Sequence, residues 1–183
     1  MDVSITPVII MVFGVACFLI GVSKGGLGGA LGFLITPLMA LVMPLNKVVG
    51  LMLPVLMIGD VFTLAFYWRK WDARQIWILL AGAVVGVTLA TFVLVSLPPD
   101  LLKKGLAVLV LLFLAYRLLE RKILAHLSYR PRPWHGLLAG STAGFASTLA
   151  HAGGPPITIY MLLQRLDPTV FIATIGLFFT VLN

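Results

Sequence analysis

Long apolar runs, each close to the length of a membrane-spanning helix, dominate the pattern of hydrophobic and polar positions along the chain. Such a helix needs about 20 mostly apolar residues, and most of these runs are apolar on all sides. No run sustains the alternation of apolar and polar residues that a membrane barrel requires. The pattern predicts helices at approximately 6–22, 28–45, 49–68, 76–96, 101–118, 135–150, 154–164 and 168–183. We therefore predict an all-α integral membrane protein, a polytopic bundle of about seven to eight hydrophobic segments.

Composition strengthens this prediction. Of the 183 residues, 61% are hydrophobic and 10% are charged, whereas a soluble domain carries about 25% charged residues. The first apolar run has neither a preceding basic stretch nor a small-residue cleavage site, so it is interpreted as a membrane segment and not as a signal peptide. Its one cysteine, Cys17, excludes an internal disulfide because the chain has no second cysteine.

The net charge of +7 is concentrated in short loops between the apolar runs. This distribution is typical of a topology signal, and nucleic-acid binding is not expected. We expect a multi-pass protein of the cell inner membrane, with the basic loops 69–75 and 117–134 on the cytoplasmic side. This orientation places the N-terminus on the outer side of the membrane. Four tryptophans flank these loops, where an aromatic belt is expected: Trp68, Trp71, Trp77 and Trp134.

An internal repeat is the most informative feature of the sequence. A glycine-rich stretch, Gly21–Gly29, ends the first segment, and a second one, Ser147–Pro156, ends the sixth. Their Gly-Gly pairs are 125 positions apart, and Pro44 and Pro168, each opening the next segment, are 124 apart. Five segments, an odd number, precede the second unit, so an inverted-topology repeat is expected.

The repeat also predicts how the chain is divided. We expect a first transmembrane repeat at 1–122, a basic loop at 123–133 and a partial second repeat at 134–183. The second unit lacks counterparts of the last two segments of the first, so a chain truncated at its C-terminus is expected.

Paired helix breaks in the two halves of a transporter indicate its substrate site. Here the breaks are expected at 21–32 and 147–156, and segment 154–164 is short enough to be a half-helix or part of a re-entrant hairpin. Free backbone N–H groups at such helix starts favour a small anion. The candidate binding residues are Ser23, Lys24, Gly25, Gly26, Gly28, Gly29, Ser147, Thr148, His151, Gly153, Gly154 and Pro155.

Several of these residues have a second interpretation. Lys24 either balances the charge of the anion or lies at the cytoplasmic interface as a topology marker. His151 contacts the substrate or a proton, or is a hydrogen-bonded structural residue. The hydroxyls of Ser23, Ser147 and Thr148 bind the anion or join helices. Asp60 is a candidate coupling residue for a proton or ion, with Asn183 near the equivalent place in the second unit, but no basic partner is evident.

Signals of enzyme chemistry are absent from the sequence. The GGLGG stretch lacks the Lys-Ser/Thr ending of a phosphate-binding loop, and the three histidines lack zinc-ligand spacing. No cofactor or metal is expected. The alternatives to a transporter are a membrane-embedded enzyme and a non-transporting assembly subunit. The expected partners are a small anion and membrane lipid, with a homo-oligomer left open.

The two glycine-rich motifs resemble those of the TauE/SafE family of sulfite exporters. They are Gly21–Gly29 with Pro37 downstream, and His151–Pro156 in the second half. The resemblance covers nearly the whole chain and implies bacterial inner-membrane transport of sulfite, sulfonates or related organic anions. Lys24 stands where small residues are more usual in the family.

Overall fold

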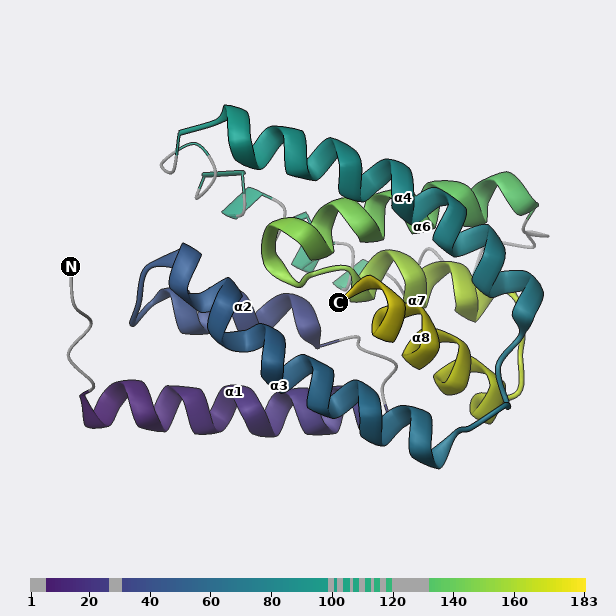
Figure 1. Ribbon diagram of the computed structural model, residues 1–183, viewed down its shortest axis with the longest axis horizontal. Helices are drawn as coiled ribbons and strands as arrows, with labels where there is room; N and C mark the ends of the chain where they lie inside the picture. The colour runs from purple at the N-terminus through teal and green to yellow at the C-terminus, as the bar shows by residue number, and fades with distance from the viewer. Residues whose placement is uncertain are drawn as a thin grey trace.

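The computed structural model describes residues 6–26, 31–98 and 132–183, together with positions 101, 104–105, 107–108, 111–112, 114–115 and 118–119. Every regular element in these ranges is an α-helix (Figure 1). Eight of the 18 positions of the predicted segment 101–118, most of the loop 117–134, and both Gly28 and Gly29 lie outside the described residues. The helices with full bounds are α1 Pro7–Gly26, α2 Gly32–Ala40, α3 Leu45–Phe66, α4 Ala73–Ser96, α6 Pro133–Ala150, α7 Gly154–Leu163 and α8 Pro168–Leu182.

Helices α1, α3 and α4 are long and apolar enough to cross a membrane. Their outer faces carry large apolar side chains that no other part of the described chain covers. Phe18 on α1, Phe66 on α3 and Phe92 on α4 are 70%, 76% and 73% exposed. Water disfavours such surfaces, whereas lipid tails cover them at no cost. The predicted all-α membrane protein is confirmed.

The predicted spanning segment at 28–45 is wrong. Helix α2 contains only nine residues, which extend about 14 Å, or half of the hydrocarbon thickness. Pro44 explains where it ends, because proline has no N–H to donate to the carbonyl group of Ala40. The chain turns at 41–43, and α3 begins at Leu45, four residues before the predicted position. Helix α7, with ten residues, is short as predicted.

The helices repeat in the order long, short, long. Helices α1, α2 and α3 form the first set, and α6, α7 and α8 form the second. In Figure 1, α1 and α3 run from left to right whereas α6 and α8 run from right to left, and the short helices α2 and α7 are likewise opposed. Identical order with reversed direction is the geometry of the inverted repeat that the sequence predicts.

A glycine seam joins the two halves along α4 and α6. A Cβ atom on Gly82 would lie 2.1 Å from the carbonyl oxygen of Leu137, and one on Gly86 would lie 1.9 Å from that of Ser141. Glycine is therefore required for the two backbones to approach this closely. Because both sets of residue numbers increase in the same direction, α4 and α6 run parallel, and their N-terminal ends share one end of the molecule (Figure 1).

The apolar core has two parts. Side chains of α1, α2 and α3 form one cluster, which includes Ile20, Met39 and Met52. Side chains of α4, α6, α7 and α8 form the other, which includes Leu79 and Phe178. The two clusters adjoin where α3 packs against α8 and α2 against α7, and the polar residues described next lie in this region.

Candidate functional site

Both chain breaks are narrower than the sequence predicts. Helix α1 continues past Lys24 to Gly26, so the first break begins only after that residue. Helix α6 continues past Ser147 to Ala150, which leaves 151–153 as the second break. Each additional helical residue pairs a carbonyl group that would otherwise cost several kcal/mol in lipid. This gain exceeds the cost of about 1 kcal/mol for a glycine within a helix.

The start of α2 lies against the second break. The hydroxyl group of Thr36 donates to the carbonyl group of Ala150, the last residue of α6. A Cβ atom on Gly32 would lie 3.3 Å from the carbonyl oxygen of His151. Short helices from the two halves of the repeat therefore begin beside one another, although more than 100 residues separate them in sequence.

His151 occupies the turn between α6 and α7. Its φ of 52° is left-handed, which reverses the chain at the end of α6. Its Nε2 lies 3.0 Å from the carbonyl oxygen of Val49 in α3. A carbonyl oxygen can only accept, so Nε2 carries a proton. The buried Nδ1 has no hydrogen-bond partner among the described residues.

A small cavity of about 20 Å³ lies between the two breaks. Such a volume holds a water molecule but no larger ligand. Ser23 and Ser147 both line this cavity, as do Gly32 and Gly154. Ser147 lies 124 positions after Ser23, the same separation as between Pro44 and Pro168, and Gly154 lies 122 positions after Gly32. The two halves of the repeat therefore contribute matching residues to the cavity. The remaining lining residues are Ile20, Lys24, Ile35, Leu56, His151, Phe179 and Asn183.

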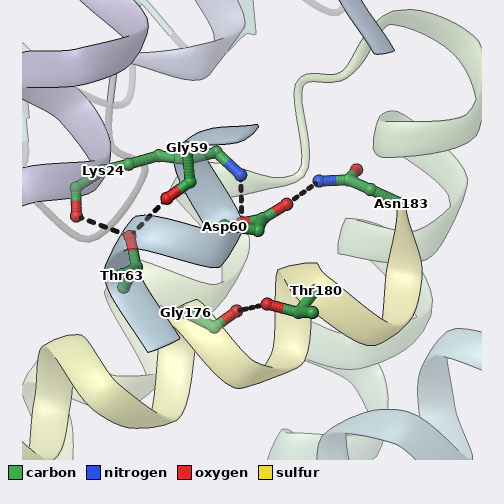
Figure 2. A network of polar contacts seen from close by, with 7 residues as sticks. All are labelled: Lys24, Gly59, Asp60, Thr63, Gly176, Thr180 and Asn183. Atoms are coloured by element: carbon green, nitrogen blue, oxygen red, sulfur yellow. Dashed lines mark hydrogen bonds and ion pairs between the residues drawn. The ribbon is translucent and has the colours of Figure 1, made fainter. Parts of the chain in front are cut away.

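Lys24 and Asp60 form an ion pair beside this cavity (Figure 2). The ammonium group of Lys24 contacts Oδ1 of Asp60, and the side chains are only 10% and 3% exposed. Oδ2 of Asp60 accepts a hydrogen bond of 2.8 Å from Nδ2 of Asn183. Both carboxylate oxygens are thus paired, as a buried charge requires.

Gly59 makes room for the lysine side chain. A Cβ atom at this position would lie 2.9 Å from Cδ of Lys24. Thr63, one turn further along α3, donates at 2.9 Å to the carbonyl group of Gly59 and lies 3.4 Å from the carbonyl oxygen of Lys24. On its other side, Thr63 meets α8 at Gly176, where a Cβ atom would lie 2.4 Å from Cγ2 of Thr63 (Figure 2). Glycines therefore allow α1, α3 and α8 to converge around the ion pair.

Lys24 also lines a larger groove of about 520 Å³ between α1 and α3. The groove extends along Gly21 and Gly25 of α1 and reaches Phe66 and Tyr67 at the end of α3. The lysine therefore lines both the larger groove and the small cavity. This burial and pairing favour the site interpretation of Lys24 over that of an interfacial topology marker.

The structure brings together five of the predicted site residues: Ser23, Lys24, Ser147, His151 and Gly154. Ser23 is oriented by the N–H of Leu31, which donates to its Oγ at 3.1 Å. Gly25 lines only the groove.

The other predicted residues that the structure describes do not line the cavity, and Gly28 and Gly29 lie outside the described residues. Thr148 donates to the carbonyl group of Gly144 within its own helix, and Gly26 is exposed at the end of α1. Gly153 instead packs closely on α6, where a Cβ atom would lie 2.6 Å from the carbonyl oxygen of Ala143. Pro155 is the second residue of α7.

Sequence reasoning missed three features of the site. It found no basic partner for Asp60, and it did not single out Gly32 or Phe179. The repeat contained a signal for Gly32, because the separation of 124 positions between the two halves makes residue 30 the equivalent of Gly154, and Gly32 is two positions further on. No comparable signal existed for Phe179, whose ring centroid lies 5.9 Å from the ammonium nitrogen of Lys24.

Opposed short helices meet at a small cavity within an inverted repeat, an arrangement that is typical of membrane transporters. The family model described as "Sulfite exporter TauE/SafE" matches residues 13–183, and the chain belongs to this family. Its members are transporters and not enzymes, so the membrane-embedded enzyme is excluded. No curated protein and no solved structure matches the chain.

Proposed function

We propose that this protein transports a small anion, such as sulfite, a sulfonate or a related organic anion, and binds it in the cavity between the two helix breaks. The observation that carries the proposal is the convergence of Lys24, Ser23, Ser147 and His151 on one cavity. Lys24 supplies a positive charge and the two hydroxyl groups supply donors, which together suit a tetrahedral or pyramidal oxyanion.

The short helices add to this preference for anions. The first N–H groups of a helix have no partner within that helix, and the helix dipole is positive at this end. Gly32 at the start of α2 and Gly154 at the start of α7 both line the cavity. Pro155 and Pro156 have no N–H, so the N–H of Gly154 is the donor that a cavity-lining residue contributes at the start of α7.

Transport requires the cavity to open. At about 20 Å³, it is too small for sulfite, so it must widen before the anion can bind. We propose alternating access in which the cluster of α1–α3 moves relative to the cluster of α4 and α6–α8, and the groove beside Lys24 becomes one of the two access routes. The groove extends toward the basic loop 69–75, which we assign to the cytoplasmic side of the cell inner membrane.

Uptake by purified protein in liposomes tests this function. The radiolabelled anions would be sulfite, methanesulfonate, sulfate and acetate, with unlabelled anions as competitors. The proposal predicts saturable, protein-dependent uptake of at least one sulfur oxyanion, and a strong reduction in a Ser23→Ala/Ser147→Ala variant. Thr88→Val is the matched control, because Thr88 is exposed and donates only within its own helix. Absence of saturable uptake for every anion would contradict the proposal.

A further inference from the structure

The Lys24–Asp60 pair leaves the site with no net charge before any substrate enters. We propose that each anion enters this site together with one proton, and that the proton is taken up by Asp60. This inference rests on the proposed function and deepens it, since it identifies the co-substrate and the residue that carries it.

Binding of an anion changes the charge balance of the site. An anion that binds Lys24 without a proton adds one uncompensated negative charge to a site whose two ionised side chains are at most 10% exposed. Such a charge is costly in a weakly polar environment. A proton that enters with the anion restores a net charge of zero.

The anion and Asp60 compete for the ammonium group of Lys24. Asp60 already forms an ion pair with Lys24. If an anion binds the ammonium group in place of Asp60, Oδ1 of Asp60 is left buried and unpaired. A proton from the aqueous phase forms an O–H bond at Oδ1, the ammonium group separates from the carboxyl group, and no covalent bond other than that of the proton donor breaks. Oδ2 keeps its hydrogen bond from Asn183, which holds the neutral carboxyl group in place.

The groups that face Asp60 identify it as the proton acceptor. Lys24 faces it from α1, and the neutral amide of Asn183 faces it from the end of α8. The other residues of α3 and α8 around it are uncharged: Thr63, Ile172, Ile175, Gly176 and Phe179. Among the described residues, His151 is the one other titratable group on the adjoining cavity. A proton on His151 would balance the charge but would leave Oδ1 of Asp60 unpaired.

Binding in solution provides the primary test. Calorimetric titration of the detergent-solubilised protein with methanesulfonate, a permanent monoanion that carries no proton itself, is performed in two buffers of different ionisation enthalpy. The wild type should take up one proton per anion bound, and its affinity should fall about tenfold per unit rise in pH where Asp60 is ionised in the free protein. The Asp60→Asn variant should take up no proton, whereas His151→Gln should retain the uptake per anion bound.

Flux in liposomes provides the second test. With a pH-sensitive dye inside, an inward methanesulfonate gradient should acidify the lumen, and the uptake rate should not respond to a potassium–valinomycin voltage. Anion binding without proton uptake, or uptake that follows the voltage, would overturn the coupling and leave the proposed function intact. Loss of proton uptake in His151→Gln with retention in Asp60→Asn would overturn the assignment to Asp60. If neither methanesulfonate nor sulfite binds or crosses, the proposed function itself is contradicted. If Asp60→Asn does not fold, the stoichiometry and voltage response of the wild type decide the matter.

Discussion

Asn183 donates a hydrogen bond of 2.8 Å to Asp60, and the two residues occupy nearly equivalent positions in the two halves of the repeat. Equivalent residues contact one another only near the axis that relates the halves. The polar site therefore lies at the centre of the inverted repeat. The equivalent of Lys24 under the Pro44–Pro168 offset is Thr148, which is neutral, so the site contains one lysine and not two.

The ion pair between Lys24 and Asp60 should be required for stability as a pair. Lys24→Met or Asp60→Leu alone leaves one buried charge uncompensated, which should cost about 3–5 kcal/mol. The Lys24→Met/Asp60→Leu double variant removes both charges and should recover most of this loss. Thermal unfolding in detergent, followed by tryptophan fluorescence, measures all three. A double variant whose loss equals the sum of the single losses would show that the two residues do not interact.

The glycine seam between α4 and α6 should not tolerate a methyl group. In Gly86→Ala the new Cβ atom would meet the Ser141 carbonyl oxygen at 1.9 Å, so the helices must separate. We expect a loss of at least about 1–3 kcal/mol, as for other overpacked sites. Gly14→Ala is the matched control, because its Cβ atom would meet nothing within 4 Å. Equal unfolding temperatures for the two variants would contradict the close approach.

Much of this fold is predictable from the sequence, because lipid imposes one simple rule on apolar segments. The hydrophobic runs predicted α1, α3, α4, α6, α7 and α8 to within four residues at each end. The error at 28–45 arose because hydrophobicity alone does not show where a helix ends. Pro44 determines that end, and its effect on the preceding carbonyl group outweighs the apolar character of the run.

The candidate site was predictable only in part. The glycine motifs and the repeat identified Ser23, Lys24, Ser147, His151 and Gly154, since each lies in or beside a helix break. The partner of Lys24 was not predictable, because Asp60 is 36 residues away and the contact depends on how α1 packs against α3 at Gly59. Packing of this kind leaves no local pattern in the sequence.

The link between the two halves should depend on Thr36. Its hydroxyl group donates to the carbonyl group of Ala150, and Thr36→Val leaves that buried acceptor without this partner. We expect a loss of about 1–3 kcal/mol together with weaker anion binding, because α2 would no longer be held against the second break. Thr91→Val is the control, since Thr91 is exposed and donates within α4. If Thr36→Val leaves the anion affinity unchanged, the position of α2 does not contribute to anion binding.

The space beside Gly59 should affect transport more than stability. In Gly59→Ala the new Cβ atom would lie 2.9 Å from Cδ of Lys24, a flexible side chain that can move aside. The displaced lysine should weaken anion binding by about tenfold, which corresponds to roughly 1.4 kcal/mol. Gly50→Ala lies in the same helix, and its Cβ atom would meet nothing within 4 Å. Binding assays on both variants compare the two positions, and equal affinities would contradict a role for the position of Lys24.

The proposed function depends on the positive charge that Lys24 supplies to bind the transported anion. Its most direct test is the initial rate of sulfur-oxyanion uptake by liposomes that contain the Lys24→Met/Asp60→Leu variant, after confirming that this variant is folded and monodisperse. Lys70→Gln removes the same charge from the exposed loop between α3 and α4 and serves as the control. We expect saturable uptake in the wild type and in Lys70→Gln, and none above empty liposomes in the double variant. Uptake by the double variant at the wild-type rate would contradict the proposed role of Lys24.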